Sequence, residues 1–295
     1  MSTDALVRTP EAAAQHRKRQ RAYWNGDAAT TWVEQEEILD TMLSPFNHLL
    51  LEEAARVKPR RILDVGCGFG TTTLALAKQL GEAGQVTGID LSQTLINHAK
   101  QRIEGAAVKP QFICDDAGAH DFGEPSFDLL VSRFGVMFFA DPVTAFANLM
   151  RAAKPGASLA FVVWRPPEEN EFLSLGPTMA AERLAQLSIE MPGADISDPG
   201  PFSLSKVDRT EQLFETAGWE DVRCEPHDLP GKLSADMLER YLAKFASMRQ
   251  DLSDVDPAEL ASINADILAA YQKFVDGDDV PFTASVWLVR ARKPG

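Results

Sequence analysis

The sequence predicts an α/β fold in which helices flank a mostly parallel sheet. Two observations predict it. Between residues 61 and 164, short apolar runs alternate with amphipathic helical segments, which is typical of parallel strands joined by right-handed crossovers. A glycine-rich turn at residues 66–70 follows the first apolar run and opens a helix. In open α/β sheets, ligands bind at such turns, outside the carboxyl ends of the strands.

Apolar runs and helix signals predict the elements in order. Strands are expected at residues 61–65, 85–89, 111–114, 127–131, 158–164, 221–225 and 283–290. Helices are expected at residues 11–24, 33–43 and 71–80, after Ser92 as N-cap, and after Asp141-Pro142. Ser44-Pro45 has the pattern of an N-cap and a first helical position, so a separate helix is expected from there to Arg56.

These elements divide the chain into a core and three additions. The expected order is an N-terminal helical lid at 1–57, the α/β core at 58–164, a cap insertion at 165–204, the core continued at 205–233, a helical cap insertion at 234–278 and the last core strand at 279–295. The β–α alternation breaks in both cap insertions, and the first of them is rich in proline.

Composition restricts the kind of partner. The chain has 29 Lys and Arg against 43 Asp and Glu, a formal net charge of -14, which repels nucleic acid and anionic lipid. Its apolar runs are too short to span a bilayer, and the first residues lack a signal-peptide pattern. Cys67, Cys114 and Cys224 show no metal-ligand spacing and suggest a reducing compartment. We expect a cytoplasmic protein with a small-molecule partner; its oligomeric state stays open.

The glycine turn and two carboxylates predict an adenosine site. The spacing Gly66-Cys67-Gly68-Phe69-Gly70 differs from the G-x-G-x-x-G of dinucleotide folds and suits a ligand without a pyrophosphate. Asp90 ends the second strand, where a carboxylate can accept hydrogen bonds from both ribose hydroxyls. Asp116 follows the third strand and can accept from an adenine amino group. A tight turn or a helix cap would explain each feature alone, but not all three in this order.

On these residues the sequence resembles the class I S-adenosylmethionine (SAM)-dependent methyltransferases, in the branch of ubiquinone- and menaquinone-type and other small-molecule enzymes. The matching motifs lie at residues 63–68, 90, 116–117, 126–132 and 149–156. The resemblance implies a Rossmann-like seven-stranded sheet with an antiparallel last strand, SAM as cofactor, and Asp64 and Gly66 at its methionine end. The expected cofactor-binding residues are Asp64, Gly66, Cys67, Gly68, Asp90, Leu91, Asp116, Ala117 and Ser132.

The expected reaction is methyl transfer to an O, N or C nucleophile of a small molecule. Where amino-methylating DNA enzymes carry Asn-Pro-Pro-aromatic after the fourth strand, this chain has Ser132-Arg133-Phe134-Gly135. The acceptor is not identified by the sequence. Two alternatives stay open: a SAM-binding protein without catalysis and, less favoured, a nicotinamide-dependent oxidoreductase.

The remaining candidates carry weaker signals. His120 and His227 are the best-placed histidines for a general base, although most lone histidines are structural. Trp24, Trp32 and Phe134, with Phe46, either line a lid and acceptor pocket or pack in the core. No metal site is expected, because residues 134–139 are apolar where magnesium would need oxygen ligands.

Overall fold

A seven-stranded sheet forms the centre of the molecule. The computed structural model describes residues 9–189, 198–247 and 255–295. The strands are β1 (Arg61–Val65), β2 (Gln85–Asp90), β3 (Gln111–Cys114), β4 (Phe127–Arg133), β5 (Ala153–Trp164), β6 (Glu220–Ser234) and β7 (Asp279–Arg292). The α-helices are α1 (Pro10–Trp24), α2 (Asp27–Glu34), α3 (Glu36–Val57), α4 (Thr71–Leu80), α5 (Gln93–Arg102), α6 (Pro142–Ala152), α7 (Glu171–Gln186), α8 (Val207–Thr216), α9 (Ala235–Ser247) and α10 (Pro257–Tyr271).

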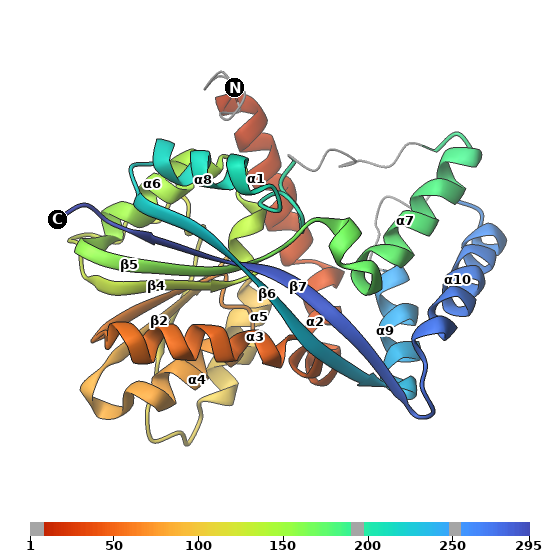
Figure 1. The fold of residues 1–295 in the computed structure, drawn as a ribbon, viewed down its shortest axis with the longest axis horizontal. Helices are drawn as coiled ribbons and strands as arrows, with labels where there is room; N and C mark the ends of the chain where they lie inside the picture. Colours follow the sequence, from red (N-terminus) through yellow and green to blue (C-terminus); the bar gives the residue numbers. More distant parts are fainter. Residues whose placement is uncertain (1–8, 190–197, 248–254) are drawn as a thin grey trace.

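The strand order is β3-β2-β1-β4-β5-β7-β6. Strands β1 to β5 pair in parallel, and β7 is antiparallel to both of its neighbours. Helices α3 and α4 lie on one face of the sheet, and α6 and α8 on the other (Figure 1). The predicted fold class is confirmed, including the antiparallel last strand. Two of the predicted N-caps are present: Ser92 accepts from the Leu95 N–H at 3.2 Å, and Asp141 accepts from the Thr144 N–H at 3.2 Å.

Helix α3 runs unbroken through Pro45, so the predicted helix start at Ser44 is wrong. Pro45 has no N–H to donate to the carbonyl four residues earlier, which is that of Thr41. Ser44 Oγ donates to this carbonyl instead, at 3.3 Å. Each buried apolar side chain contributes about 1.5–3 kcal/mol, whereas an internal proline costs about 3 kcal/mol. The helix therefore persists because its buried face continues on both sides of the proline: Ile38, Leu39, Met42, Phe46, Leu49 and Leu50.

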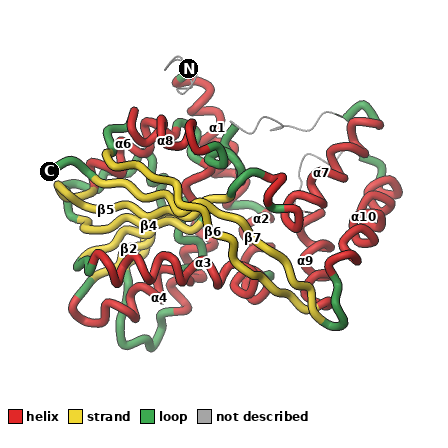
Figure 2. The backbone as a smooth tube through the Cα atoms, viewed as in Figure 1, coloured by secondary structure: helices red, strands yellow, loops and turns green. Residues whose placement is uncertain are grey.

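Strand β6 is much longer than the five residues predicted for it. It pairs with β7 as far as Ser234 opposite Asp279, and the two strands form a ribbon that extends past the rest of the sheet (Figure 2). Pro226 and Pro230 lie within this pairing and argue against a strand in the sequence. They are tolerated because β6 is an edge strand, where a missing N–H on the outer side breaks no ladder hydrogen bond.

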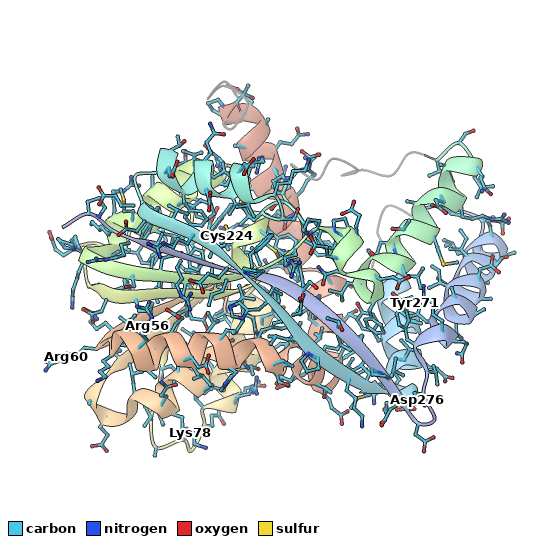
Figure 3. All side chains as sticks on the ribbon, in the orientation of Figure 1. Arg56, Arg60, Lys78, Cys224, Tyr271 and Asp276 are labelled. Atoms are coloured by element: carbon cyan, nitrogen blue, oxygen red, sulfur yellow. The ribbon has the colours of Figure 1, made fainter. Side chains whose placement is uncertain are left out.

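The two predicted cap insertions meet as one helical module at the end of this ribbon. Helix α7 comes from the first insertion and α9 and α10 from the second, and the three lie together beyond the sheet (Figure 1). Parts of both insertions, residues 190–197 and 248–254, lie outside the described residues. Phe172 stacks on Phe282 with 4.2 Å between ring centroids, and Tyr271 is 1% exposed. Figure 3 shows Tyr271 in this module and Arg56, near the end of α3, at the opposite end of the molecule.

Candidate functional site

The glycine turn after β1 is bent by left-handed backbone conformations. Gly66, Gly68 and Gly70 have φ values of 68°, 55° and 83°, which side chains other than glycine rarely adopt. Gly66 also touches the turn after β4, because a Cβ added to it would lie 2.6 Å from the Cα of Gly135. The glycines therefore do two things: they reverse the chain, and they let the backbones after β1 and β4 meet.

Asp90 joins the glycine turn to the end of β2. One carboxylate oxygen accepts from the Gly68 N–H at 2.8 Å and the other from the Ser92 N–H at 2.9 Å. Burial raises the pKa of Asp90, and the N–H groups of Ser92 and Gly68 oppose this rise. Each carboxylate oxygen can accept a second hydrogen bond, so the group retains capacity for a ligand's hydroxyls.

Asp64 is buried beside the glycine turn. It is 1% exposed, and Thr73 Oγ1 donates to it at 2.6 Å. Burial raises its pKa to about 6, against the Thr73 hydrogen bond and the positive charge of Arg133. Arg133, which the sequence analysis did not select, donates from Nη1 to the Leu43 carbonyl at 3.1 Å. Asp64 and Arg133 therefore place a buried negative charge and a positive charge near the glycine turn.

The residues after β3 form a compact turn with a histidine. Asp116 Oδ1 accepts from the Gly118 N–H at 2.9 Å, and Ala117 is 7% exposed. His120 Nδ1 lies 2.8 Å from Asp115 Oδ2, and this hydrogen bond lowers the pKa of Asp115. His120 is therefore held by a carboxylate beside the predicted adenine residues.

The end of β4 is packed with aromatic rings. Ser132 is fully buried, and its hydroxyl donates to the Val65 carbonyl at 2.7 Å, so that it ties β4 to β1. Phe134 has a φ of 66°, a conformation that costs a bulky residue of order 1–3 kcal/mol and is concentrated at functional sites. Its ring stacks on Trp164 at 4.0 Å and meets the edge of Phe46 at 5.0 Å.

The end of α1 contacts three of these loops. Trp24 packs edge-on against Trp32 at 5.5 Å and against Phe138 at 5.8 Å, and Phe138 follows β4 in the 3-10 turn Gly135–Phe138. Arg21 lies 3.7 Å from Asp115, after β3. Asn25 hydrogen-bonds the loop after β2. The predicted lid tryptophans thus lie at the strand ends, and both have ordinary packing partners there.

Helix α3 differs from α1 and α2 in its contacts. Glu53, near its end, is 3% exposed and accepts from Arg290 Nε of β7 at 2.9 Å. Phe46 packs on Trp164 of β5. Helix α3 is thus fastened to the sheet, and a movable lid within residues 1–57 would consist of α1 and α2.

His227 lies on β6, opposite Val286 of β7, and β6 is three strands away from β4 in the sheet. Its Nε2 is buried and has no hydrogen-bond partner among the described residues. Of the two predicted general-base candidates, only His120 is adjacent to the strand-end residues.

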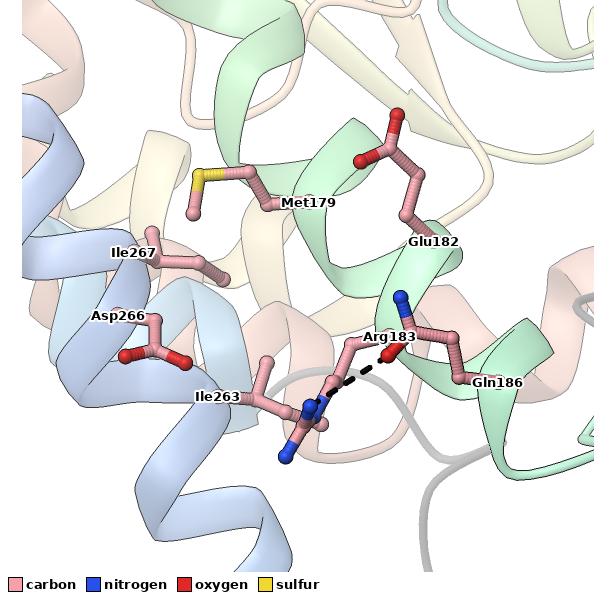
Figure 4. A pocket seen from close by; sticks show the side chains of 7 residues that line it. All are labelled: Met179, Glu182, Arg183, Gln186, Ile263, Asp266 and Ile267. Carbon is pink, nitrogen blue, oxygen red and sulfur yellow. Dashed lines mark hydrogen bonds between the residues drawn. The ribbon is translucent and has the colours of Figure 1, made fainter.

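The described part of the chain offers neither a metal cluster nor a membrane-spanning helix. Across residues 9–189, 198–247 and 255–295, no three His, Cys, Asp or Glu side chains are grouped so that they could hold a metal ion. In the same ranges, no helix has the length and apolar character to cross a membrane. A pocket between α7 and α10 is lined only by side chains of these two helices (Figure 4), namely Met179, Glu182, Arg183, Gln186, Ile263, Asp266 and Ile267.

Sequence reasoning missed the polar groups that act across loops. Arg133 and Thr73 contact Asp64 or its surroundings, and Asn25 contacts the loop after β2. Gly135 was noted only as a departure from another family's motif. The signal for Gly135 was its place directly after a strand end; the others had no local signal, because their partners are distant in the sequence.

Comparison with known proteins identifies the core. A family model described as a methyltransferase domain matches residues 62–156. The chain is 31% identical over 150 residues to aklanonic acid methyltransferase DauC of a Streptomyces species, covering 48% of this chain and 68% of that protein. It is 32% identical over 112 residues to 2-phytyl-1,4-naphtoquinone methyltransferase of a Nostoc species, covering 37% and 49%. The chain spans about half the length of the first curated relatives it matches.

Solved structures share the fold at lower identity. The YcgJ protein of Bacillus subtilis matches with a TM-score of 0.54 and 17% identity over 84% of this chain and 98% of that chain. The cyclase SpnF matches with a TM-score of 0.51 and 21% identity over 84% and 81%. These two likenesses concern the fold alone. With DauC aligned over 68% of its length and the methyltransferase model over the strands that form the site, the chain belongs to the class I SAM-dependent methyltransferases.

Proposed function

We propose that this protein transfers the methyl group of SAM to an O, N or C nucleophile of a small molecule. The observation that carries the proposal is the placement of Asp90: a partly buried carboxylate at the end of β2, hydrogen-bonded to Gly68 of the glycine turn at 2.8 Å. A carboxylate in that position is suited to the two hydroxyls of a ribose. Asp116 and Ala117, one strand further along the sheet, suit the adenine.

The residues present fit the other parts of SAM. Asp64 and Gly66 would bind the methionine end, where the negative charge of Asp64 complements an ammonium group. Cys67 and Gly68 would contact the nucleoside through the turn, and Leu91 would cover the adenosine from the end of β2. The hydroxyl of Ser132 is already bonded to the Val65 carbonyl. Ser132 would therefore support the cofactor site by holding the ends of β4 and β1 together.

When bound, SAM supplies an electrophilic methyl group on a positively charged sulfur. The chain's part in the reaction is positioning and exclusion of water. Aromatic faces stabilise a nearby cation, and Phe134, Phe46 and Trp164 gather at the ends of β4 and β5. The same rings favour an acceptor with an aromatic or conjugated body. Helices α1 and α2 would act as the lid, since α1 contacts the loops after three strands.

The named relatives suggest which acceptors to screen. They act, by name, on a phytyl naphthoquinone and on aklanonic acid; a naphthoquinone has a conjugated ring system, which suits the aromatic side chains at the strand ends. If the acceptor must lose a proton, His120 and His227 are the candidates for the general base. We further propose that the protein acts in the cytoplasm and that nucleic acid is not its substrate, in keeping with the net charge of -14.

Replacing Asp90 with alanine tests the cofactor site. Hydrogen bonds to a charged group contribute about 1.5–3 kcal/mol, so Asp90→Ala should bind S-adenosylhomocysteine about ten-fold or more weakly by titration calorimetry. Asp121→Ala is the matched control, because Asp121 is an exposed carboxylate after β3 whose recorded partner is the Gly123 N–H at 2.9 Å. Equal affinity of Asp90→Ala and wild type would refute the ribose assignment.

Product formation separates catalysis from binding alone. An enzyme converts SAM to S-adenosylhomocysteine only when an acceptor is present, whereas a SAM-binding protein without catalysis does not convert it with any acceptor in the screen. Titration with NADH, followed by its fluorescence, tests the nicotinamide alternative; saturable binding at micromolar concentration would favour that alternative.

A further inference from the structure

The corner between α1 and α2 contains an asparagine with three hydrogen bonds to the main chain. Asn25 is the C-cap of α1, and its Nδ2 donates to the Arg21 carbonyl of the same helix at 2.9 Å. The same amide reaches across to the loop after β2: Nδ2 donates to the Leu91 carbonyl at 3.1 Å, and Oδ1 accepts from the Gln93 N–H at 2.9 Å. An amide side chain supplies a donor and an acceptor on separate atoms, as this arrangement uses them.

The loop that Asn25 holds is the one that orients Asp90. The Ser92 N–H donates to the Asp90 carboxylate, and the Leu91 carbonyl and the Gln93 N–H on either side of Ser92 are the two groups bonded to Asn25. The Gln93 N–H is one of the first N–H groups of α5, which have no partner within the helix. Asn25 therefore holds the three residues that follow Asp90, through the Leu91 carbonyl and the Gln93 N–H.

Two other contacts of the α1 corner go to the loops after β3 and β4. Trp24 packs on Phe138 after β4, and Arg21 lies near Asp115 after β3. Neither contact involves residues 90–93. Asn25 makes two hydrogen bonds to the loop after β2, and removing its amide deletes both of them.

We propose that Asn25 is a positioning residue for the cofactor: it sets the affinity for SAM and S-adenosylhomocysteine by holding the Leu91–Gln93 loop, and through it the Asp90 carboxylate, in the geometry that receives the ribose. The proposal rests on the proposed function. It makes the α1–α2 corner part of the cofactor site, although no atom of Asn25 has to touch the ligand. It also couples the position of the N-terminal helices to cofactor binding.

Titration calorimetry with S-adenosylhomocysteine, on full-length protein, tests the proposal through Asn25→Ala. We expect affinity five- to ten-fold weaker than wild type. The matched control is Asn97→Ala, which removes an exposed asparagine hydrogen bond on the same α5 helix, from Gln93 Nε2 at 2.7 Å, without touching the loop backbone. It should change affinity less than two-fold.

A double substitution distinguishes positioning from general stabilisation. If Asn25 acts through Asp90, Asn25→Ala should weaken binding less than two-fold once Asp90 is already alanine. Asn25→Asp sharpens the test, because it keeps the acceptor for Gln93 but has no donor for Leu91. The dipole of α5 favours an acid near its start, whereas the dipole of α1 disfavours an acid at its end, so the two effects on stability oppose each other; this variant should still bind several-fold more weakly.

Two results would overturn the proposal. One is a lower melting temperature for Asn25→Ala with an affinity within two-fold of wild type, which would make Asn25 a helix-corner residue only. The other is the same fold-change in the wild-type and Asp90→Ala backgrounds, which would mean that Asn25 does not act through Asp90. Failure of the proposed function looks different: wild type would not bind S-adenosylhomocysteine, or Asp90→Ala would bind it as wild type does, and both proposals would fall together.

Discussion

The strand ends and the distal helical module are held together by different interactions. At the strand ends, Asp64, Asp90 and Ser132 each hydrogen-bond a group on another segment, beside the rings of Phe134 and Trp164. In the module, Phe172 stacks on Phe282, and the Tyr271 hydroxyl donates to the Phe172 carbonyl at 2.6 Å beneath a layer of aromatic rings. Substitutions at the strand ends should therefore change binding first, and substitutions in the module should change stability first.

The largest effect should be a loss of stability when an aromatic ring is removed from the core of the helical module. Phe172 is 2% exposed, and Phe→Ala at a buried site costs about 3–5 kcal/mol in unfolding free energy. Phe172→Ala should lose that much in urea unfolding while its affinity for S-adenosylhomocysteine stays within two-fold of wild type. Leu187→Ala is the control, since Leu187 is 42% exposed at the end of α7 and should change stability by less than about 0.5 kcal/mol. A parallel loss of affinity would erase the contrast between the two regions.

The second effect separates backbone strain from backbone contact in the glycine turn. Gly66→Ala meets both a left-handed φ of 68° and a Cα of Gly135 at 2.6 Å, so it should cost about 2–4 kcal/mol and abolish measurable cofactor binding. Gly68→Ala has a φ of 55° and open space around the added carbon, so strain alone should cost about 1–2 kcal/mol. Similar losses in thermal unfolding for both variants would show that the contact with Gly135 is unimportant.

The third effect is a pH dependence of binding. The pKa of Asp64 is raised to about 6 in the free protein, and a bound ammonium group would lower it, so binding favours the ionised form. Affinity for S-adenosylhomocysteine should therefore rise about ten-fold from pH 5 to pH 7 and level off above, which corresponds to about 1.4 kcal/mol. Asp64→Asn should lose most of this slope; Asp90, whose pKa is also raised by burial, supplies the remainder. A wild-type profile in Asp64→Asn would assign the titration elsewhere.

Removal of divalent metal ions should have no effect on turnover. We predict that methyl transfer needs no metal ion, because the segment after β4 is apolar and Asp141, near it, caps α6 through Thr144. Once an acceptor is known, turnover should be equal with and without EDTA. Inhibition by EDTA that magnesium reverses would show that Asp115 or Asp141 binds a metal ion.

Local sequence patterns gave the core and the positions of the candidate site. The β–α alternation placed all five parallel strands, and the position after each strand identified Gly66, Asp90 and Asp116. Where the prediction was wrong, the deciding energy was not local. Pro45 lies inside α3 because apolar burial on both sides outweighs one lost hydrogen bond, and Pro226 lies inside β6 because that strand is at the edge of the sheet.

The sequence by itself determined the fold class, the family and the residues at the strand ends, because glycine turns, strand periodicity and helix caps are properties of short segments. Only the tertiary structure decided which of those residues have partners: that Asp64 is buried against Thr73, that Gly66 touches Gly135, that the two insertions pack as one module, and that Asn25 holds the loop behind Asp90. Most of those contacts join segments far apart in the sequence: Asn25 and Leu91 are 66 positions apart, and Tyr271 and Phe172 are 99 apart. Their geometry depends on how the whole sheet brings the loops to one edge.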